Sequence, residues 1–141
     1  MSTTLVEENA NPGQRAAERV KNRMDPLIDQ HLAAHGEGTK SPCRPTAESL
    51  FDEKCLAAAT SIGAIAEAAL AEIEGVDEPG FATLRQASAH TAEAARGYAE
   101  LDCADNPQDP ATRSKCVDHG SVIAQAPRDL MDGLRLGLAG Q

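Results

Sequence analysis

The sequence predicts an all-α protein, folded as an antiparallel four-helix bundle with up-down-up-down topology. Three observations support this prediction. Apolar residues recur at steps of three and four, the spacing that places them on one face of a helix. Much of the 41% hydrophobic content is alanine, the strongest helix former. Clusters rich in glycine, proline, asparagine or aspartate delimit four segments, and the short connections favour antiparallel neighbours.

The first helix is expected over 14–35, after a flexible N-terminal tail at 1–13, and 14–141 should form a single helical-bundle domain. Asp25-Pro26 has the character of a helix start, because the carboxylate can cap amide hydrogens and proline has none. We therefore expect this helix to be kinked or broken at Pro26. Two histidines stand where leucine is expected on its apolar stripe, which runs Val20, Met24, Leu27, His31 and His35.

The remaining helices are expected over 46–74, 78–103 and 110–138, the last two starting at the cap pairs Asp77 with Pro79 and Asp109 with Pro110. The helical period places Cys55 and Cys116 on the buried stripes of the second and fourth helices. Alanine buries little surface and aromatic residues are only 2% of the chain. So thin a core calls for a disulfide, a metal or self-association, and we expect a homo-oligomer.

The formal net charge of −9 argues against nucleic acid or an anionic membrane as a partner, because both would repel the protein. The sequence also predicts no membrane-spanning segment and no secretory signal at its start. Cytoplasmic residence is the default expectation. If the cysteines form disulfides, we expect a secreted protein instead.

Histidine and cysteine side chains should gather at one pole of such a bundle. His31 and His35 lie one turn apart on the first helix, and Cys116 and His119 on the fourth. One thiolate and three imidazoles would suit tetrahedral zinc, which is the metal that the sequence suggests. The alternative is that His31 is a core residue and His35 interacts with the C-terminal end of the helix dipole.

The four cysteines also admit disulfides or buried free thiols. Cys103 and Cys116 bracket the third connection, and a bond between them would stabilise the fold by about 3 kcal/mol in the loop-entropy model. Cys43–Cys55 is expected to be difficult: with a helix from Thr46, Cys55 would lie about 13 Å along its axis. Pairing of Cys43 and Cys55 with the other helices is then the consistent disulfide alternative, and the sequence leaves the order of pairing open.

Two function classes follow, and no catalytic residue is predicted. The first is a non-enzymatic, acidic binding or regulatory protein, of the inhibitor or immunity type, acting through a protein partner towards which its charge steers it. The alternative is a metal- or haem-binding bundle with a Cys/His site at one pole, redox-responsive through its thiols. An enzyme would arise from the second class, through an open metal position.

Overall fold

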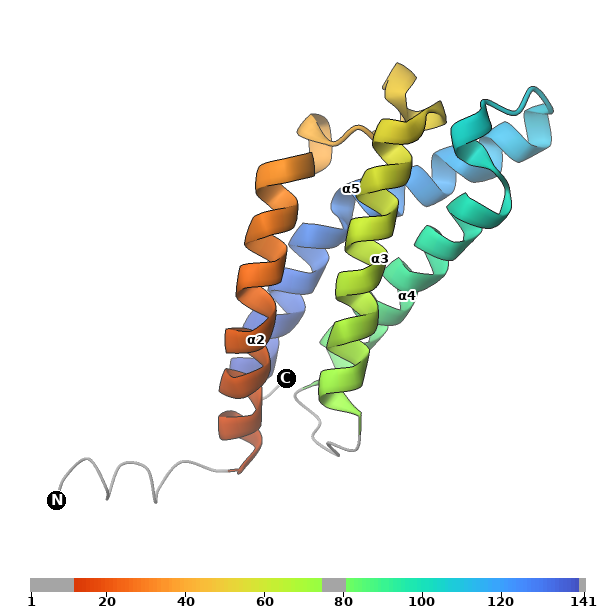
Figure 1. Ribbon diagram of the computed structural model, residues 1–141. Helices are drawn as coiled ribbons and strands as arrows, with labels where there is room; N and C mark the ends of the chain where they lie inside the picture. The colour runs from red at the N-terminus through yellow and green to blue at the C-terminus, as the bar shows by residue number, and fades with distance from the viewer. Residues whose placement is uncertain (1–11, 75–80, 140–141) are drawn as a thin grey trace, which may run out of the picture.

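The computed structural model describes residues 12–74 and 81–139, and these residues form helices and connections without any strand. Four α-helices, α2 (Pro12–His35), α3 (Glu53–Ile73), α4 (Ala82–Glu100) and α5 (Pro110–Leu138), make up the body of the molecule (Figure 1). Short 3-10 turns η1 (Gly38–Lys40), η2 (Glu48–Phe51) and η4 (Cys103–Asp105) lie in the connections. The all-α prediction is confirmed. Of the expected tail, residues 1–11 lie outside the described residues, and α2 begins at Pro12.

The start of α5 follows its predicted cap. Asp109 accepts a hydrogen bond from the Thr112 backbone N–H (3.0 Å), and α5 begins at Pro110 as predicted. These bonds favour the carboxylate and hold the pKa of Asp109 below its usual value. The Asp77 and Pro79 cap falls outside the described residues. α2 continues through Pro26 as one helix, so the chain is not broken there.

The predicted start of the second helix near Thr46 is wrong. Residues 48–51 form η2, Asp52 is extended, and its side chain accepts a hydrogen bond from the Lys54 backbone N–H (2.8 Å). Asp52 is therefore the N-cap, and α3 begins at Glu53. The third helix likewise ends earlier than expected, at Glu100, because Asp102 adopts a left-handed conformation (φ 52°).

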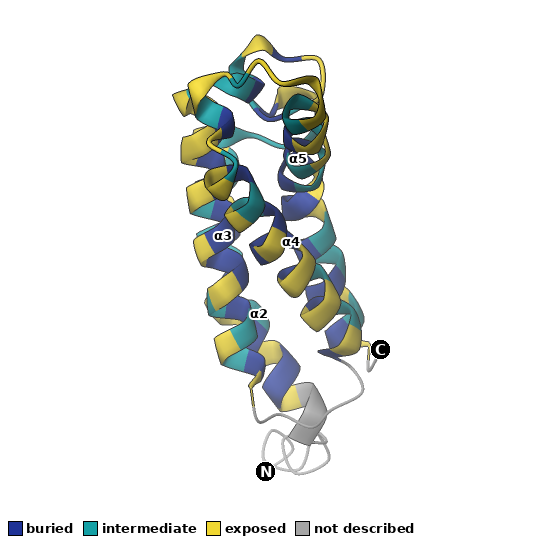
Figure 2. Cartoon of the chain, turned by 90° about the vertical axis from the view of Figure 1, so that its right-hand side faces the viewer, coloured by how far each residue is buried: buried dark blue, intermediate teal, exposed yellow. Residues whose placement is uncertain are grey.

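The core lies between the facing sides of the four helices, where buried residues recur along each helix (Figure 2). On α2 the stripe passes through Ile28 instead of the expected Leu27, which is only partly buried. Small residues bring the helices close: a Cβ added at Gly63 of α3 would lie 2.8 Å from the Ala95 Cβ of α4. The ion pair of Arg23 with Glu72 (3.2 Å) joins α2 to α3 at the surface.

α3 is the one helix in the described ranges whose length and apolar composition would suffice to cross a membrane. About two fifths of its most apolar window (39%) is buried in the protein, and the core helix of a soluble bundle meets the same criteria. α3 meets these criteria by its mean composition and not by an unbroken apolar run, so the expectation of no membrane-spanning segment stays a prediction. Alanine accounts for eight of the 21 residues of α3.

Candidate functional site

The four cysteines form two disulfides at one end of the molecule. Cys43 bonds Cys55 (S–S 2.11 Å, Cα–Cα 4.9 Å), and Cys103 bonds Cys116 (S–S 2.06 Å, Cα–Cα 5.7 Å). All four are fully buried, as the stripes predicted for Cys55 and Cys116. We call residues 36–55 and 101–116, the two connections that carry these bonds, the disulfide end (upper part of Figure 1).

The expectation that Cys43 and Cys55 could hardly pair is wrong, and the late start of α3 is the reason. Because the helix begins at Glu53, Cys55 lies in its first turn and not two to three turns along its axis. η2 and the turns before it fold residues 43–52 back, so the two Cα atoms come within disulfide distance. The Cys103–Cys116 bond is one of the pairings that the sequence left open.

The two connections of the disulfide end are fastened to each other and to the helices. Tyr98 of α4 is fully buried, and its hydroxyl donates a hydrogen bond to the Leu50 carbonyl of η2 (2.7 Å). Burial and the nearby Asp52 carboxylate both raise the pKa of this phenol, so it stays protonated and able to donate. On α5, Gly120 leaves room for the same connection, since an added Cβ would lie 2.7 Å from the Cys43 carbonyl oxygen. These contacts and the two disulfides restrain the disulfide end.

The structure does not bring the four proposed zinc ligands together. The Cys116 sulfur is bonded to Cys103, so it is not a thiolate. The rings of His31 and His35 are tilted by 44° with their centroids 4.9 Å apart, whereas His119 lies against Gly97 of α4. Among the described residues, no three His, Cys, Asp or Glu side chains have a metal-binding arrangement.

His31 is a core residue with a specific partner. Its side chain is 3% exposed, and its Nδ1 lies 2.8 Å from the Ser61 hydroxyl of α3. Burial, and secondarily the neighbouring His35, lower the pKa of His31 from 6.5 to about 4. The ring is therefore neutral at pH 7 and serves as a hydrogen-bonding core residue in place of leucine. This agrees with the alternative that the sequence left open for it.

Acidic side chains concentrate at the last residue of α4 and on the part of the disulfide end that follows it. Glu100, Asp102, Asp105 and Asp109 are all exposed, and we call these four residues the acidic edge. Arg113 of α5 does not cover them. Its guanidinium donates hydrogen bonds to the Asn106 side chain (2.6 Å) and the Pro107 carbonyl (2.8 Å). It also lies over the ring of Phe51 in η2.

A second feature of this end was missed in the sequence. Lys40, Arg44 and Lys54 line one surface pocket of about 400 Å³ together with His35, and we call it the basic pocket. These residues come from α2, η1, a loop and α3, so no helical or strand period connects them. The available signal was composition, because residues 31–47 contain a single carboxylate in a chain with 22.

Comparisons with known proteins add no relative. No protein-family model, no curated protein sequence and no solved structure matches this chain.

Proposed function

We propose that the protein is a non-enzymatic binding or regulatory protein of an oxidising, extracytoplasmic compartment, and that it acts through a protein partner. Two buried disulfides support the compartment, since such bonds persist where thiols are not kept reduced. The metal- or haem-binding alternative loses its thiolate ligand to the Cys103–Cys116 bond. Recognition of a protein is therefore the better supported class.

One observation carries the proposal: the acidic edge stands on a part of the chain that is covalently fixed. Cys103 lies inside the edge and is bonded to α5, while Asp109 is held by its bonds to Thr112. Surface charges on a rigid frame lose little conformational entropy on binding, so they favour a specific complex. Their sign suits a basic partner, and the net charge of −9 would accelerate the encounter.

The compartment is tested by intact-mass analysis of the protein purified from its source, alkylated with and without prior reduction. We expect no alkylation without reductant and four added groups with it. Alkylation of the unreduced protein at all four cysteines would overturn this part of the proposal.

The partner is tested by affinity capture from the extracytoplasmic fraction of the source, using oxidised protein as bait. A variant with Glu100→Gln, Asp102→Asn and Asp105→Asn removes three charges of the acidic edge and nearly preserves side-chain shape. The partner should bind the wild-type protein in a saturable, salt-sensitive manner, and this variant at least tenfold more weakly.

The matched control removes the same number of charges elsewhere. Glu18→Gln, Glu74→Gln and Glu93→Gln neutralise exposed carboxylates on α2, after α3 and on α4. This control should retain the partner. Equal weakening in both triple variants would show that net charge alone is responsible, and the acidic edge would not be the recognition surface.

We also propose that the four helices alternate in direction and that α2 bends at Pro26. The alternation is supported by contacts between opposite ends of neighbouring helices: Arg23 with Glu72 joins the first half of α2 to the end of α3. Similarly, Gly133 near the end of α5 packs on Leu84 near the start of α4. Distances between spin-label pairs at helix ends test the alternation, and residual dipolar couplings along α2 test the bend. Parallel neighbours or a straight α2 would refute the corresponding statement.

Self-association is the remaining proposal. Leu56 is the one large hydrophobic side chain among the described residues that is exposed (37%), and it borders a shallow groove between α3 and α4. Alanine and glycine form most of this groove, including Gly63, Ala64, Ala92 and Ala95. Sedimentation equilibrium should reveal a dimer that Leu56→Lys converts to monomer. A wild-type protein that remains monomeric at all concentrations would contradict this expectation.

A further inference from the structure

The basic pocket is unusual for so acidic a protein. Three cationic side chains, Lys40, Arg44 and Lys54, line a hollow of about 400 Å³. None of the residues that line it carries a carboxylate. Like charges are normally dispersed or paired on a protein surface, because their repulsion costs stability. Their presence around one hollow therefore suits a ligand of opposite charge.

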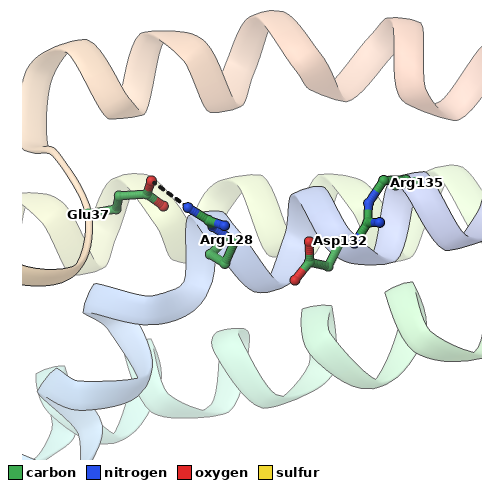
Figure 3. A network of polar contacts seen from close by, with 4 residues as sticks. All are labelled: Glu37, Arg128, Asp132 and Arg135. Carbon is green, nitrogen blue, oxygen red and sulfur yellow. Dashed lines mark hydrogen bonds and ion pairs between the residues drawn. The ribbon is translucent and has the colours of Figure 1, made fainter.

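Two acidic residues that lie near the pocket in the sequence, Glu37 and Asp52, are engaged elsewhere. Glu37 is the only carboxylate within residues 31–47, and it reaches away to Arg128 of α5 (3.8 Å), as Figure 3 shows. Farther along α5, Asp132 and Arg135 pair with each other (3.0 Å). Asp52 is used as the cap of α3, where it accepts the Lys54 backbone N–H. These carboxylates therefore do not pair with the cations of the basic pocket.

The pocket is also built on a fixed frame. Cys43, next to Arg44, is bonded to Cys55, next to Lys54, so the disulfide ties two of the three cation-bearing segments together. The Arg44 guanidinium donates a hydrogen bond to the Ser41 carbonyl (3.0 Å), which restricts its position. A preorganised cluster loses less entropy when it binds an anion.

We infer that the basic pocket binds the phosphate group of a small organic phosphate monoester. Three positive charges balance a dianion better than a monoanionic carboxylate, and ammonium and guanidinium groups are the usual protein donors to phosphate. The volume of about 400 Å³ falls in the range of small-molecule sites. Pro42 and Ala57 in its wall offer an apolar surface for the organic part. This site is distinct from the acidic edge, and its test requires no protein partner.

Titration calorimetry of the oxidised protein tests the inference with three probes: inorganic phosphate, phenyl phosphate and benzoate. Phenyl phosphate should bind with one-to-one stoichiometry and more tightly than inorganic phosphate, because only it also covers the apolar wall. Benzoate has the same ring but a single charge, so it should bind at least tenfold more weakly than phenyl phosphate. Lys40→Gln combined with Lys54→Gln should weaken phenyl phosphate binding at least tenfold.

Lys21→Gln combined with Lys115→Gln is the matched control, because it changes the net charge equally on α2 and α5, outside the pocket. It should leave the affinity within twofold of the wild-type value. Thermal melts of both double variants check that each is folded. The inference is overturned if phenyl phosphate shows no saturable binding, if both double variants weaken it equally, or if benzoate binds as tightly.

Discussion

Replacing His31 with leucine should make the fold more resistant to acid. In the native protein the ring is 3% exposed, its Nδ1 lies 2.8 Å from the Ser61 hydroxyl, and the His35 ring lies beside it. Burial and His35 lower the pKa of His31 from 6.5 to about 4. Leucine has a suitable volume for this position and no proton to gain. Ser61 is only half-buried, so its hydroxyl can bond to water after the substitution.

The sign and size follow from proton linkage. Between the native pKa of about 4 and the ordinary value of 6.5, the unfolded chain protonates this ring and the native protein does not. The free energy of unfolding therefore falls as the pH falls through this window. The stability that depends on the neutral His31 ring is fully present only above the window. Over the whole window the loss amounts to about 3 kcal/mol, because each pH unit of pKa difference corresponds to about 1.4 kcal/mol.

Urea unfolding followed by circular dichroism, at about pH 7.5 and about pH 4.5, measures the effect. From about pH 7.5 to about pH 4.5, the free energy of unfolding of the wild-type protein should fall by about 2.5 kcal/mol more than that of His31→Leu. His90→Gln alters an exposed imidazole on α4 and should follow the wild-type protein. If His31→Leu loses as much stability as the wild-type protein, His31 is not the neutral buried base that the structure indicates.

Three packing predictions use the same unfolding assay at neutral pH. Gly120→Ala should destabilise the fold by about 2 kcal/mol or more, because the added Cβ would lie 2.7 Å from the backbone oxygen of Cys43. An unchanged stability would show that α5 does not pack so closely on the connection that contains Cys43. Gly63→Ala should also destabilise the fold. The double variant Gly63→Ala with Ala95→Gly should be at least about 1 kcal/mol more stable than the sum of the two single effects predicts. Additive effects would count against the 2.8 Å approach of α3 to α4. Tyr98→Phe should cost about 1–2 kcal/mol, because a buried carbonyl of η2 loses its donor, and an unchanged stability would mean that this bond is not formed.

Local signals account for the helices that the sequence predicted well. Asp109-Pro110 combines a side chain that accepts amide hydrogens with a residue that needs no donor, and α5 begins there. The start of α3 was missed because Thr46 and Asp52 are both acceptable caps by residue type. Only the tertiary bond from Tyr98 to η2 and the disulfide at Cys43 show why the chain delays the helix until Asp52.

The candidate site was predictable in its place but not in its chemistry. Cysteine and histidine positions in the sequence pointed to one pole, and the two disulfides lie at a single end. The helical period can place Cys116 on a buried face, but it does not show whether the sulfur of Cys116 is a thiolate or part of a disulfide. The basic pocket was beyond sequence patterns altogether, because Lys40 and Lys54 meet only through the folded connection.

The short loops closed by the disulfides bear on their purpose. The bonded cysteines are 12 and 13 residues apart, so each bond fixes one connection and its adjoining helix instead of joining distant parts of the chain. Loop entropy gives each about 3 kcal/mol, and longer loops would yield only slightly more, since the dependence is logarithmic. Stability alone therefore does not select these pairings. What they determine is the shape of the disulfide end, where one bond holds Arg44 beside Lys54 and the other fixes the acidic edge to α5. That placement is the physical reason to look for recognition at this end of the protein.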